Sequence, residues 1–374
     1  MTADEHFIRR ALDLARAGVG LVSPNPAVGA VLTDAKGREV GTGTHTYDGV
    51  KHAEVLAIEQ AGRAAQGGTL YINLEPCSHQ GRTPPCADAV IAAGISRLVC
   101  SMEDPNPQVA GRGFAKPKAA GINVDVGLLE SEAKKLNESF AKYIRHGKPL
   151  VTLKSAMSLD GKIASAAASP KNSQTRDRWV TGEAARAHVQ TLRHRNDAIL
   201  VGVGTVIADD PLLTDRSGLP RRRKLLRVIL DSSLRIPPES KILRSAENDV
   251  LVICSKPNPP ARRALEEKGI RVHQVSSGSV GRPEFTALLQ FLGKMEITSL
   301  MIEGGSSVNS AALASGEVDK LFLYYAPKIL GANAVPFVAG EVTNSASRCL
   351  QQLELHRFGD DFAVEGYLRD PYSR

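Results

Sequence analysis

The stretch LEPCSHQGRTPPC (74–86) carries two of the five cysteines of this 374-residue chain, Cys77 and Cys86, and each directly follows a proline. Upstream, His52 opens a His-x-Glu sequence and a run with helical spacing of apolar residues. One imidazole and two thiolates are three zinc ligands, and they leave the fourth vertex of the metal open, as in catalytic zinc sites. The sequence therefore predicts that His52, Cys77 and Cys86 bind a catalytic metal ion.

Glu54 follows the predicted histidine ligand by two residues and is the predicted catalytic residue. A carboxylate beside a zinc ion, but not bound to it, can take the proton of the activated water and later pass it to a departing amine. Hydroxide attack on an amidine carbon and loss of ammonia would follow. His-x-Glu followed by Pro-Cys is typical of zinc nucleobase deaminases. Taken separately, a helix start at His52 and two buried thiols are the alternatives.

The insert between the cysteines, SHQGRTPP (78–85), is longer than the two residues of the short deaminase signature. His79 within it is the alternative fourth ligand, but a fourth side chain would close the position that a catalytic zinc needs. A disulfide is the weakest alternative, because five cysteines are odd in number and sparse for this length. We therefore expect one zinc ion and a cytoplasmic location.

Length and composition indicate a two-domain globular protein. The hydrophobic and charged fractions are 42% and 23%, which is ordinary for a soluble chain. Neither a signal peptide nor a membrane-spanning run is evident, so no membrane partner is expected. The net charge is +7, which suits a phosphorylated small-molecule substrate. The densest basic run (221–224) has no aromatic residues beside it, so a solvated loop is favoured over a nucleic-acid site.

Apolar periodicity alternates between strand and helix spacing along the chain, which predicts an α/β protein. The break is expected in HGKP (146–149), so that residues 1–147 and 148–374 form two domains. The second half ends in strands without helices between them, which predicts a mixed sheet with an antiparallel edge. Strands are expected at 27–34, 69–75, 97–102, 122–126, 150–157, 197–203, 225–231, 249–254, 270–275, 298–303, 318–326, 351–357 and 362–368. Helices are expected at 4–18, 53–65, 86–94, 111–120, 130–146, 183–195, 259–268, 284–293 and 306–315. The patch 165–178 is expected to be a mobile loop.

Several motifs resemble the bifunctional deaminase/reductases of riboflavin biosynthesis. In the first half they are SPNPAVGAVL (23–32), HAE (52–54), the cysteine stretch above and EDPNPQVAGRG (103–113). In the second half they are LKSAMSLDGKIA (153–164), ILVGVGTVIADDPLLTDR (199–216), RVILDS (227–232) and IEGGSSVNSAAL (302–313). The resemblance covers nearly the whole chain in the family's order.

This resemblance implies a cytidine-deaminase-like three-layer αβα domain followed by a dihydrofolate-reductase-like α/β domain. It also implies two consecutive reactions. First, 2,5-diamino-6-ribosylamino-4(3H)-pyrimidinone 5′-phosphate loses an exocyclic amine. NADPH then reduces the ribosyl chain to give 5-amino-6-(5-phospho-D-ribitylamino)uracil. By analogy with the family, the reductase domain would also associate into a homo-oligomer.

The resemblance implies roles for further residues, besides the zinc ligands and Glu54. Substrate contacts are implied for Asn25, His45, Arg82, Lys154, Arg193, Leu213, Arg216 and Glu303, and for the turn Asp104-Pro105-Asn106. NADPH contacts are implied for Ala156, Trp179, Thr205, Asp209, Ser232, Gly305, Ser306, Ser307, Val308, Asn309, Ser310 and Ala311. Without the family, a turn at Asn25, exposed charges at the arginines and core packing of Trp179 are the alternatives.

The second domain can also be interpreted from its own residues. Gly304-Gly305 ends a predicted strand and precedes a predicted helix, where backbone N–H groups can approach a diphosphate. Gly202-Val203-Gly204-Thr205 offers a similar turn. Neither matches a GxGxxG fingerprint, which argues against a Rossmann domain. Lys154 and Glu303 are candidates for supplying or organising the proton that accompanies hydride, and Asp160 is expected to be either a site residue or a turn former.

One position departs from the family, which usually has a serine two residues before the tryptophan. Here that position is Asp177, with Ser169 or Ser173 as substitutes. A nucleic-acid base deaminase with an accessory nucleotide-binding domain is the alternative enzyme. A non-catalytic zinc- and nucleotide-binding protein is the alternative of another class, although Glu54 is superfluous to that role.

Overall fold

A computed structural model describes residues 1–81, 84–165, 179–278, 281–340 and 349–373. Contacts divide the chain into two compact units. One unit comprises residues 1–147 with 220–223, and the other comprises residues 148–219 with 224–373. Among the described residues, no helix is long and apolar enough to cross a membrane.

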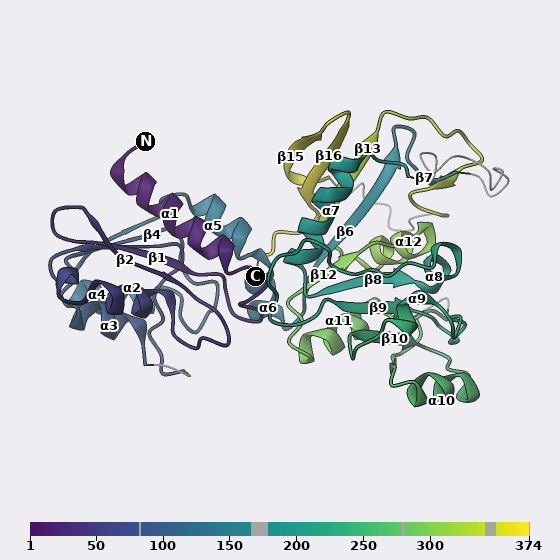
Figure 1. The fold of residues 1–374 in the computed structure, drawn as a ribbon, viewed down its shortest axis with the longest axis horizontal. Helices are drawn as coiled ribbons and strands as arrows, with labels where there is room; N and C mark the ends of the chain where they lie inside the picture. The colour runs from purple at the N-terminus through teal and green to yellow at the C-terminus, as the bar shows by residue number, and fades with distance from the viewer. Residues whose placement is uncertain (82–83, 166–178, 279–280, 341–348, 374) are drawn as a thin grey trace. The chain divides into compact units, whose positions relative to one another are not determined.

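The first unit is a five-stranded sheet with helices on both faces (Figure 1). Its strands are β1 (Gly29–Thr33), β2 (Glu39–Thr44), β3 (Thr69–Ile72), β4 (Arg97–Cys100) and β5 (Asn123–Val126). Its helices are α1 (Ala3–Ala17), α2 (Ala53–Ala61), the 3-10 helix η1 (Gly62–Ala65), α3 (Cys86–Ala92), α4 (Arg112–Ala119), α5 (Glu130–Leu136) and α6 (Glu138–His146). The strand order is β2-β1-β3-β4-β5, antiparallel around β1 and parallel from β3 to β5. Helices α1 and α5 cover one face, and α2, α3 and α4 cover the other, which confirms the three-layer αβα fold.

The expectation of one helix over 130–146 is wrong, because the chain breaks at Asn137 between α5 and α6. Asn137 is buried, and its side chain both accepts from the N–H of Ala27 at 2.8 Å and donates to the carbonyl of Ala27 at 3.1 Å. The backbone of Asn137 departs from helical values, with φ −107° and ψ 16°, while its side chain makes these bonds to Ala27. The long predicted helix is therefore two short ones.

The second unit is built on a nine-stranded mixed sheet. Its strands are β6 (Leu150–Ser158), β8 (Ala198–Gly202), β9 (Leu226–Leu230), β10 (Val250–Cys254), β11 (Arg271–Gln274), β12 (Ser299–Ile302), β13 (Lys320–Ala326), β15 (Gln351–Phe358) and β16 (Asp361–Tyr367). A small separate sheet pairs β7 (Lys162–Ala164) with β14 (Val335–Pro336). The helices are α7 (Glu183–Arg195), α8 (Val203–Asp209), α9 (Lys241–Arg244), α10 (Pro259–Glu267), α11 (Phe285–Lys294) and α12 (Ser306–Ser315).

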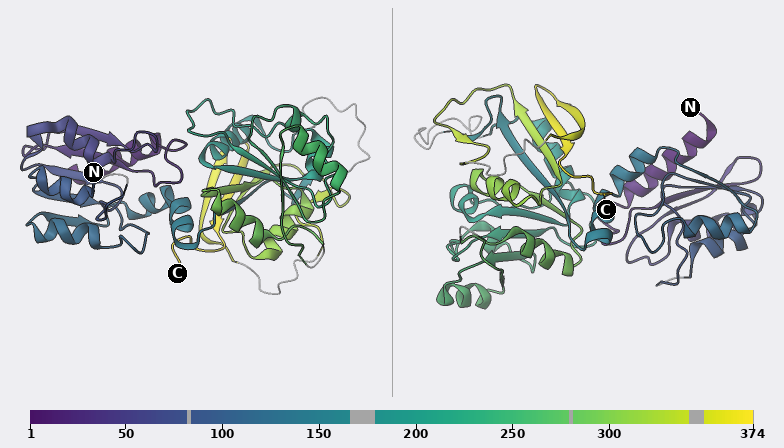
Figure 2. Two further views of the ribbon diagram at one scale, coloured as in Figure 1. Left: turned by 90° about the horizontal axis from the view of Figure 1, so that it is seen from below. Right: turned by 180° about the vertical axis from the view of Figure 1, so that it is seen from behind.

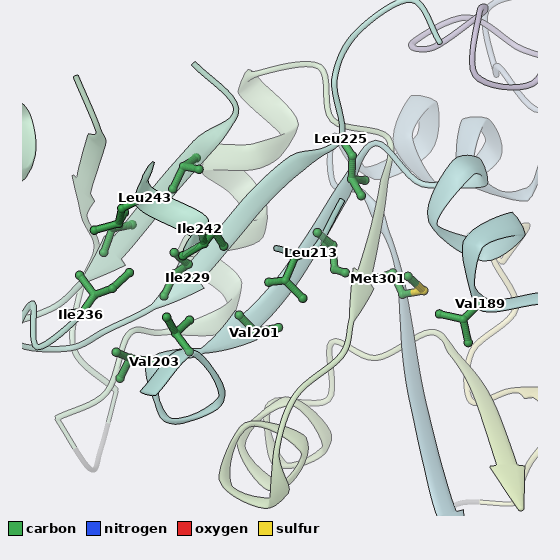
Figure 3. Packing of buried hydrophobic residues seen from close by; sticks show 14 of the residues in the cluster. Val189, Val201, Val203, Leu213, Leu225, Ile229, Ile236, Ile242, Leu243 and Met301 are labelled. Atoms are coloured by element: carbon green, nitrogen blue, oxygen red, sulfur yellow. The ribbon is translucent and has the colours of Figure 1, made fainter. Parts of the chain in front are cut away.

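The order of the large sheet is β11-β10-β9-β8-β12-β6-β13-β16-β15, and the pairs from β11 to β13 are parallel. The pairs that join β13, β16 and β15 are antiparallel, which confirms the mixed sheet with an antiparallel edge. Figure 2 shows helices on both sides of this sheet. One apolar core joins α7, α8, α9 and α10 to one face, and another joins α11 and α12 to the opposite face. In Figure 3, Val201, Ile229 and Met301 project from neighbouring strands into the first of these cores.

The connections of the parallel strands define where a ligand can approach. The chain leaves β8 through α8 on one face, and it leaves the adjacent strand β12 through α12 on the other face. Neighbouring strands whose connections run to opposite sides form a topological switch point, and open α/β sheets bind ligands there, at the carboxyl ends of the strands. The two predicted glycine turns, 202–205 and 304–305, follow directly after β8 and β12.

Candidate zinc and cofactor sites

The three predicted metal ligands converge in the first unit. Nδ1 of His52 lies 3.1 Å from Sγ of Cys86 and 3.5 Å from Sγ of Cys77. His52 is the N-cap of α2 and Cys86 is the first residue of α3, so two helix starts and the loop after β3 assemble the group. Among the described residues, no fourth histidine, cysteine, aspartate or glutamate joins the group, and His79 is not part of it. This donor set fits a zinc ion with an open position.

The protonation of the cysteines also fits a metal site. Hydrogen bonds from Cys86 and from His52 lower the pKa of Cys77 to about 4, so this side chain is a thiolate. The pKa of the Cys86 thiol is raised, because its proton is held by Cys77 and because it is buried. The pair thus shares one proton, which zinc binding would release.

Glu54 lies in the first turn of α2 and is 3% exposed. Burial raises the pKa of this carboxyl to about 7, although the nearby charge of His52 lowers it. A carboxyl group with a pKa near neutrality can both accept and donate a proton, which general acid–base catalysis requires. Glu54 lies outside the ligand group, as predicted for a proton carrier.

Two predicted substrate contacts, Asn25 and His45, lie together in the structure. Nδ2 of Asn25 is 3.0 Å from Nε2 of His45, and the other ring nitrogen of His45 is 3.0 Å from the carbonyl of Lys51. The ring of His45 also packs edge-on against the ring of His52, with centroids 5.2 Å apart. Asn25 and His45 therefore border the metal ligands.

A third predicted contact, the turn that begins at Asp104, follows β4. Its carboxylate accepts from the N–H of Asn106 at 2.8 Å, and the side chain of Asn106 accepts from the N–H of Gln108 at 3.0 Å. Burial raises the pKa of Asp104 to about 7, and the charges of Glu75 and Cys77 act in the same direction. The predicted contact Arg82 lies outside the described residues, as do Ser169, Ser173, Asp177 and the mobile loop expected around them.

In the second unit, Glu303 brings two other predicted substrate residues together. Arg193 donates from Nε and Nη2 to the two oxygens of Glu303 at 2.9 and 3.0 Å. Nζ of Lys154 lies 3.7 Å from the same carboxylate. The three residues come from α7, the end of β12 and β6. They form a buried charged group of two cations and one anion.

The loop with Leu213 and Arg216 is attached to this group. Nη1 of Arg193 donates to the carbonyl of Thr214 at 2.9 Å, so one guanidinium holds both Glu303 and the loop. Leu213 is buried and has a left-handed φ of 55°, a conformation that ordinary side chains rarely adopt and that often marks a functional site. The side chain of Arg216 is exposed.

The start of α12 presents unsatisfied polar atoms at the switch point. Oγ of Ser306 and Oδ1 of Asn309 are buried and have no hydrogen-bond partner among the described residues. Gly305 is the N-cap of α12, and within the described parts of the chain a Cβ there would meet only Oγ1 of Thr205, 3.7 Å away. The backbone N–H groups at a helix N-terminus and the hydroxyl of Ser306 can donate to the diphosphate of a dinucleotide cofactor.

The other predicted cofactor residues follow the same edge of the sheet. Ala156 is near the carboxyl end of β6, Thr205 and Asp209 are in α8 after β8, and Ser232 follows β9. Parallel strands place their carboxyl ends at one edge, so these positions and the start of α12 share it. Within α12, Ser307 is exposed, whereas Val308, Ser310 and Ala311 are half-buried.

Trp179, the only tryptophan, is 53% exposed, so core packing does not explain it. The guanidinium of Arg186 lies over its ring, 5.3 Å from the centroid. Asp160 lies in the turn after β6, and its carboxylate accepts from the hydroxyl of Ser158 and from the N–H groups of Leu330 and Gly331.

Sequence reasoning missed several residues that hold these sites. Arg227 is 1% exposed and ties the carbonyl of Leu212, next to Leu213, to the carboxylate of Asp249. The side chain of Asn73 donates a hydrogen bond to the carbonyl of Ala27 and accepts one from the N–H of Gly29, and so fixes the chain that follows Asn25. A charge inside the apolar strand pattern LRVIL was the available signal for Arg227, because buried charges are rare unless paired.

Comparisons with known proteins cover both units. Residues 1–102 match the cytidine and deoxycytidylate deaminase zinc-binding region, and residues 149–364 match the RibD C-terminal domain. Together with the His52, Cys77 and Cys86 group, these matches define a zinc-binding deaminase joined to a reductase. The chain is 40% identical to the riboflavin biosynthesis protein RibD of Aquifex aeolicus, over 96% of this chain and 97% of that protein. It is 41% identical to the Escherichia coli RibD, over 88% and 89% of the two chains.

Solved structures give the same result. Acinetobacter baumannii RibD superposes with a TM-score of 0.82 at 36% identity, over 98% of both chains. A diaminohydroxyphosphoribosylaminopyrimidine deaminase/5-amino-6-(5-phosphoribosylamino)uracil reductase from Thermotoga maritima gives 0.79 at 35% identity, also over 98% of both chains. The chain belongs to the RibD family of bifunctional riboflavin-biosynthesis deaminase/reductases.

Proposed function

We propose that the chain deaminates 2,5-diamino-6-ribosylamino-4(3H)-pyrimidinone 5′-phosphate in its first unit and reduces the ribosyl side chain of the product with NADPH in its second. The observation that carries the first step is the group of His52, Cys77 and Cys86 with the buried Glu54 beside it. The matches along both halves favour this enzyme over a nucleic-acid deaminase with an accessory domain. We also propose residues 1–147 and 148–374 as the catalytic domains.

In the deamination, His52, Cys77 and Cys86 would hold the zinc ion, which supplies an activated water when bound. Glu54 takes a proton from that water and later gives it to the amine, so that water enters and ammonia leaves. The side chains of Asn25 and His45, 3.0 Å apart, orient the base.

In the reduction, NADPH would lie at the carboxyl ends of β8 and β12 and supply hydride when bound. The N–H groups at the start of α12 bind its diphosphate. Arg193 contributes positive charge near the substrate phosphate, and its Nε and Nη2 are held by Glu303. Lys154 supplies the proton that accompanies hydride, and Glu303 keeps this ammonium in place.

The test is an assay of the purified chain for bound zinc, ammonia release and NADPH consumption. One zinc ion per chain is expected, together with ammonia release from the diaminopyrimidine ribotide and NADPH oxidation on the deaminated product. Transfer RNA and single-stranded DNA serve as comparison substrates. Ammonia release from either nucleic acid but not from the ribotide would contradict the proposal.

We further propose that the second unit pairs with a second copy of the chain through β15. This strand ends the described order of the large sheet, and Leu353 and Leu355 on it are 54% and 70% exposed. A strand at the end of a sheet that exposes two leucines is a candidate surface for pairing. Sedimentation should therefore show a dimer or larger species, and Leu355→Lys should shift it toward monomer. A monomeric wild-type chain would contradict this proposal.

The predicted cytoplasmic location can be tested by cell fractionation.

A further inference from the structure

One buried carboxylate beside the metal ligands is not explained by the proposed chemistry. Glu75 is 3% exposed and lies two residues before Cys77. Its Oε2 accepts from the N–H of Asp104 and the N–H of Gly111, both at 3.0 Å. Its Oε1 accepts from the N–H of Gly113 at 2.7 Å. All these donors belong to one segment, 104–113, which contains the predicted substrate turn.

A carboxylate suits this position better than any neutral side chain. Both of its oxygens only accept, so one side chain can satisfy N–H groups on two sides. Such bonds to an ionised acceptor are about twice as strong as those between neutral groups. A glutamine of the same shape would offer one acceptor and would point its own N–H₂ at a backbone donor. The segment would lose bonds and gain a repulsive contact.

The segment also packs directly against the loop after β3, which carries Cys77. A Cβ on Gly113 would lie 1.9 Å from the carbonyl oxygen of Pro76 and 2.8 Å from Cγ of Glu75. Only a glycine lets α4 begin this close to Pro76, the residue before Cys77. The loop after β3 and the segment with the substrate turn are thus joined by hydrogen bonds at Glu75 and by close packing at Gly113.

We propose that Glu75 is a positioning residue of the deaminase: it fixes the 104–113 segment so that Asp104 and Asn106 meet the substrate beside the metal ligands. This inference rests on the proposed deaminase function. It assigns Glu75 no contact with substrate or metal. The bonds at Asp104 and Asn106 shape the turn locally, and Glu75 sets the distance of the whole turn from Cys77.

The test is Glu75→Gln in the full-length zinc-bound enzyme, with Asp34→Asn as the matched control. Asp34 is also a backbone-binding carboxylate of the first unit, which accepts from the N–H groups of Lys36 and Arg38. Asp34 follows the C-terminal end of β1, whereas His45 lies beside the N-terminal end of the same strand. Glu75→Gln should raise KM for the ribotide by about tenfold or more, with a much smaller change in kcat and unchanged zinc content. Asp34→Asn should leave KM unchanged.

KM decides the matter because it does not depend on the fraction of active protein, which a purely structural defect would lower. Gly113→Ala provides a second route, since its Cβ would push α4 from Pro76 with Glu75 intact, and it should also raise KM. A KM within twofold of wild type in a zinc-bound Glu75→Gln protein would overturn the inference. Loss of zinc from both Glu75→Gln and Gly113→Ala would also overturn it. Absence of wild-type ammonia release would instead refute the proposed function itself.

Discussion

Arg193 and Glu303 form a two-pronged ion pair, with Nε donating to Oε1 at 2.9 Å and Nη2 donating to Oε2 at 3.0 Å. The residues are 110 positions apart in the sequence. Burial by itself would raise the pKa of Glu303, but Lys154 and Arg193 outweigh it and hold the pKa at about 2. The carboxylate therefore stays ionised at any working pH, and it fixes the two cations that the proposed reduction uses.

Glu303→Gln should abolish reduction and spare deamination. The glutamine leaves the cations of Arg193 and Lys154 without a counter-charge, and breaking a buried pair in this way costs about 3–5 kcal/mol. NADPH oxidation on the deaminated substrate should fall about 100-fold or more, the scale of a lost proton-transfer arrangement. Ammonia release and zinc content should match wild type.

Glu365→Gln is the matched control for this variant. Glu365 also forms a buried ion pair in the second unit, with Nζ of Lys320 at 2.7 Å, but on β16 near the antiparallel edge. It should lower the melting temperature while turnover of the folded protein stays near wild type. Equal losses of turnover in both variants would mean that Glu303 matters only for stability.

Glu54→Gln should remove deamination and keep the metal. The amide has the shape of the carboxylic acid but cannot carry the proton, and general acid–base groups contribute about 100- to 10,000-fold. Zinc content by elemental analysis and NADPH oxidation on pre-deaminated substrate should be unchanged. Wild-type ammonia release from a zinc-loaded Glu54→Gln protein would show that the carboxyl group of Glu54 plays no part in the reaction.

Two adjacent glycines after β12 should respond differently to substitution. A Cβ at Gly304 would lie 2.7 Å from Val308, so Gly304→Ala should lower the melting temperature. At Gly305 the protein leaves room, and serine is a good N-cap, so Gly305→Ser should fold normally. Its side chain would fill the space over the start of α12, which should raise KM for NADPH about tenfold, or about 1.4 kcal/mol of binding. An unchanged KM for NADPH would place the cofactor elsewhere.

The zinc site was predictable from sequence because its residue types are restrictive. His52, Glu54, Cys77 and Cys86 form a pattern that few other chemistries need, and the structure brings the three ligands together. Alternating periodicity likewise predicted the layers of both units. Local propensity was sufficient for these elements, since the apolar pattern and the fold agree.

The residues that hold the sites in place were not predictable in this way. Asn137 lies at the break between α5 and α6 and bonds to the backbone of Ala27 through its side chain. Glu75 accepts hydrogen bonds from three N–H groups of a segment about 30 to 40 positions away. Such bonds depend on tertiary neighbours, which periodicity does not reveal. Short elements such as β2 and α8 were missed for a related reason: β2 is rich in glycine and threonine, and its glycines allow α2 to pack closely on the strand.

The stability of the second unit should depend on pH through His188. Its Nδ1 is 2.6 Å from the hydroxyl of Tyr324, and its ring stacks on Phe358 with centroids 4.7 Å apart. Burial, helped by the charges of Arg195 and His356, lowers the pKa of His188 from 6.5 to about 4. As the pH falls through this window, the unfolded chain binds a proton that the folded chain does not, so the free energy of unfolding falls.

His188→Gln removes that titration and leaves a polar partner for Tyr324, so its melting temperature should fall less steeply between pH 6.5 and about 4 than that of wild type. The exposed His6 provides the control, since His6→Gln should leave the slope of the wild type unchanged. Other groups titrate in the same range, but they are common to all three proteins, and the difference between slopes isolates His188. Parallel curves for wild type and His188→Gln would mean that the folded protein protonates His188 as readily as the unfolded chain does.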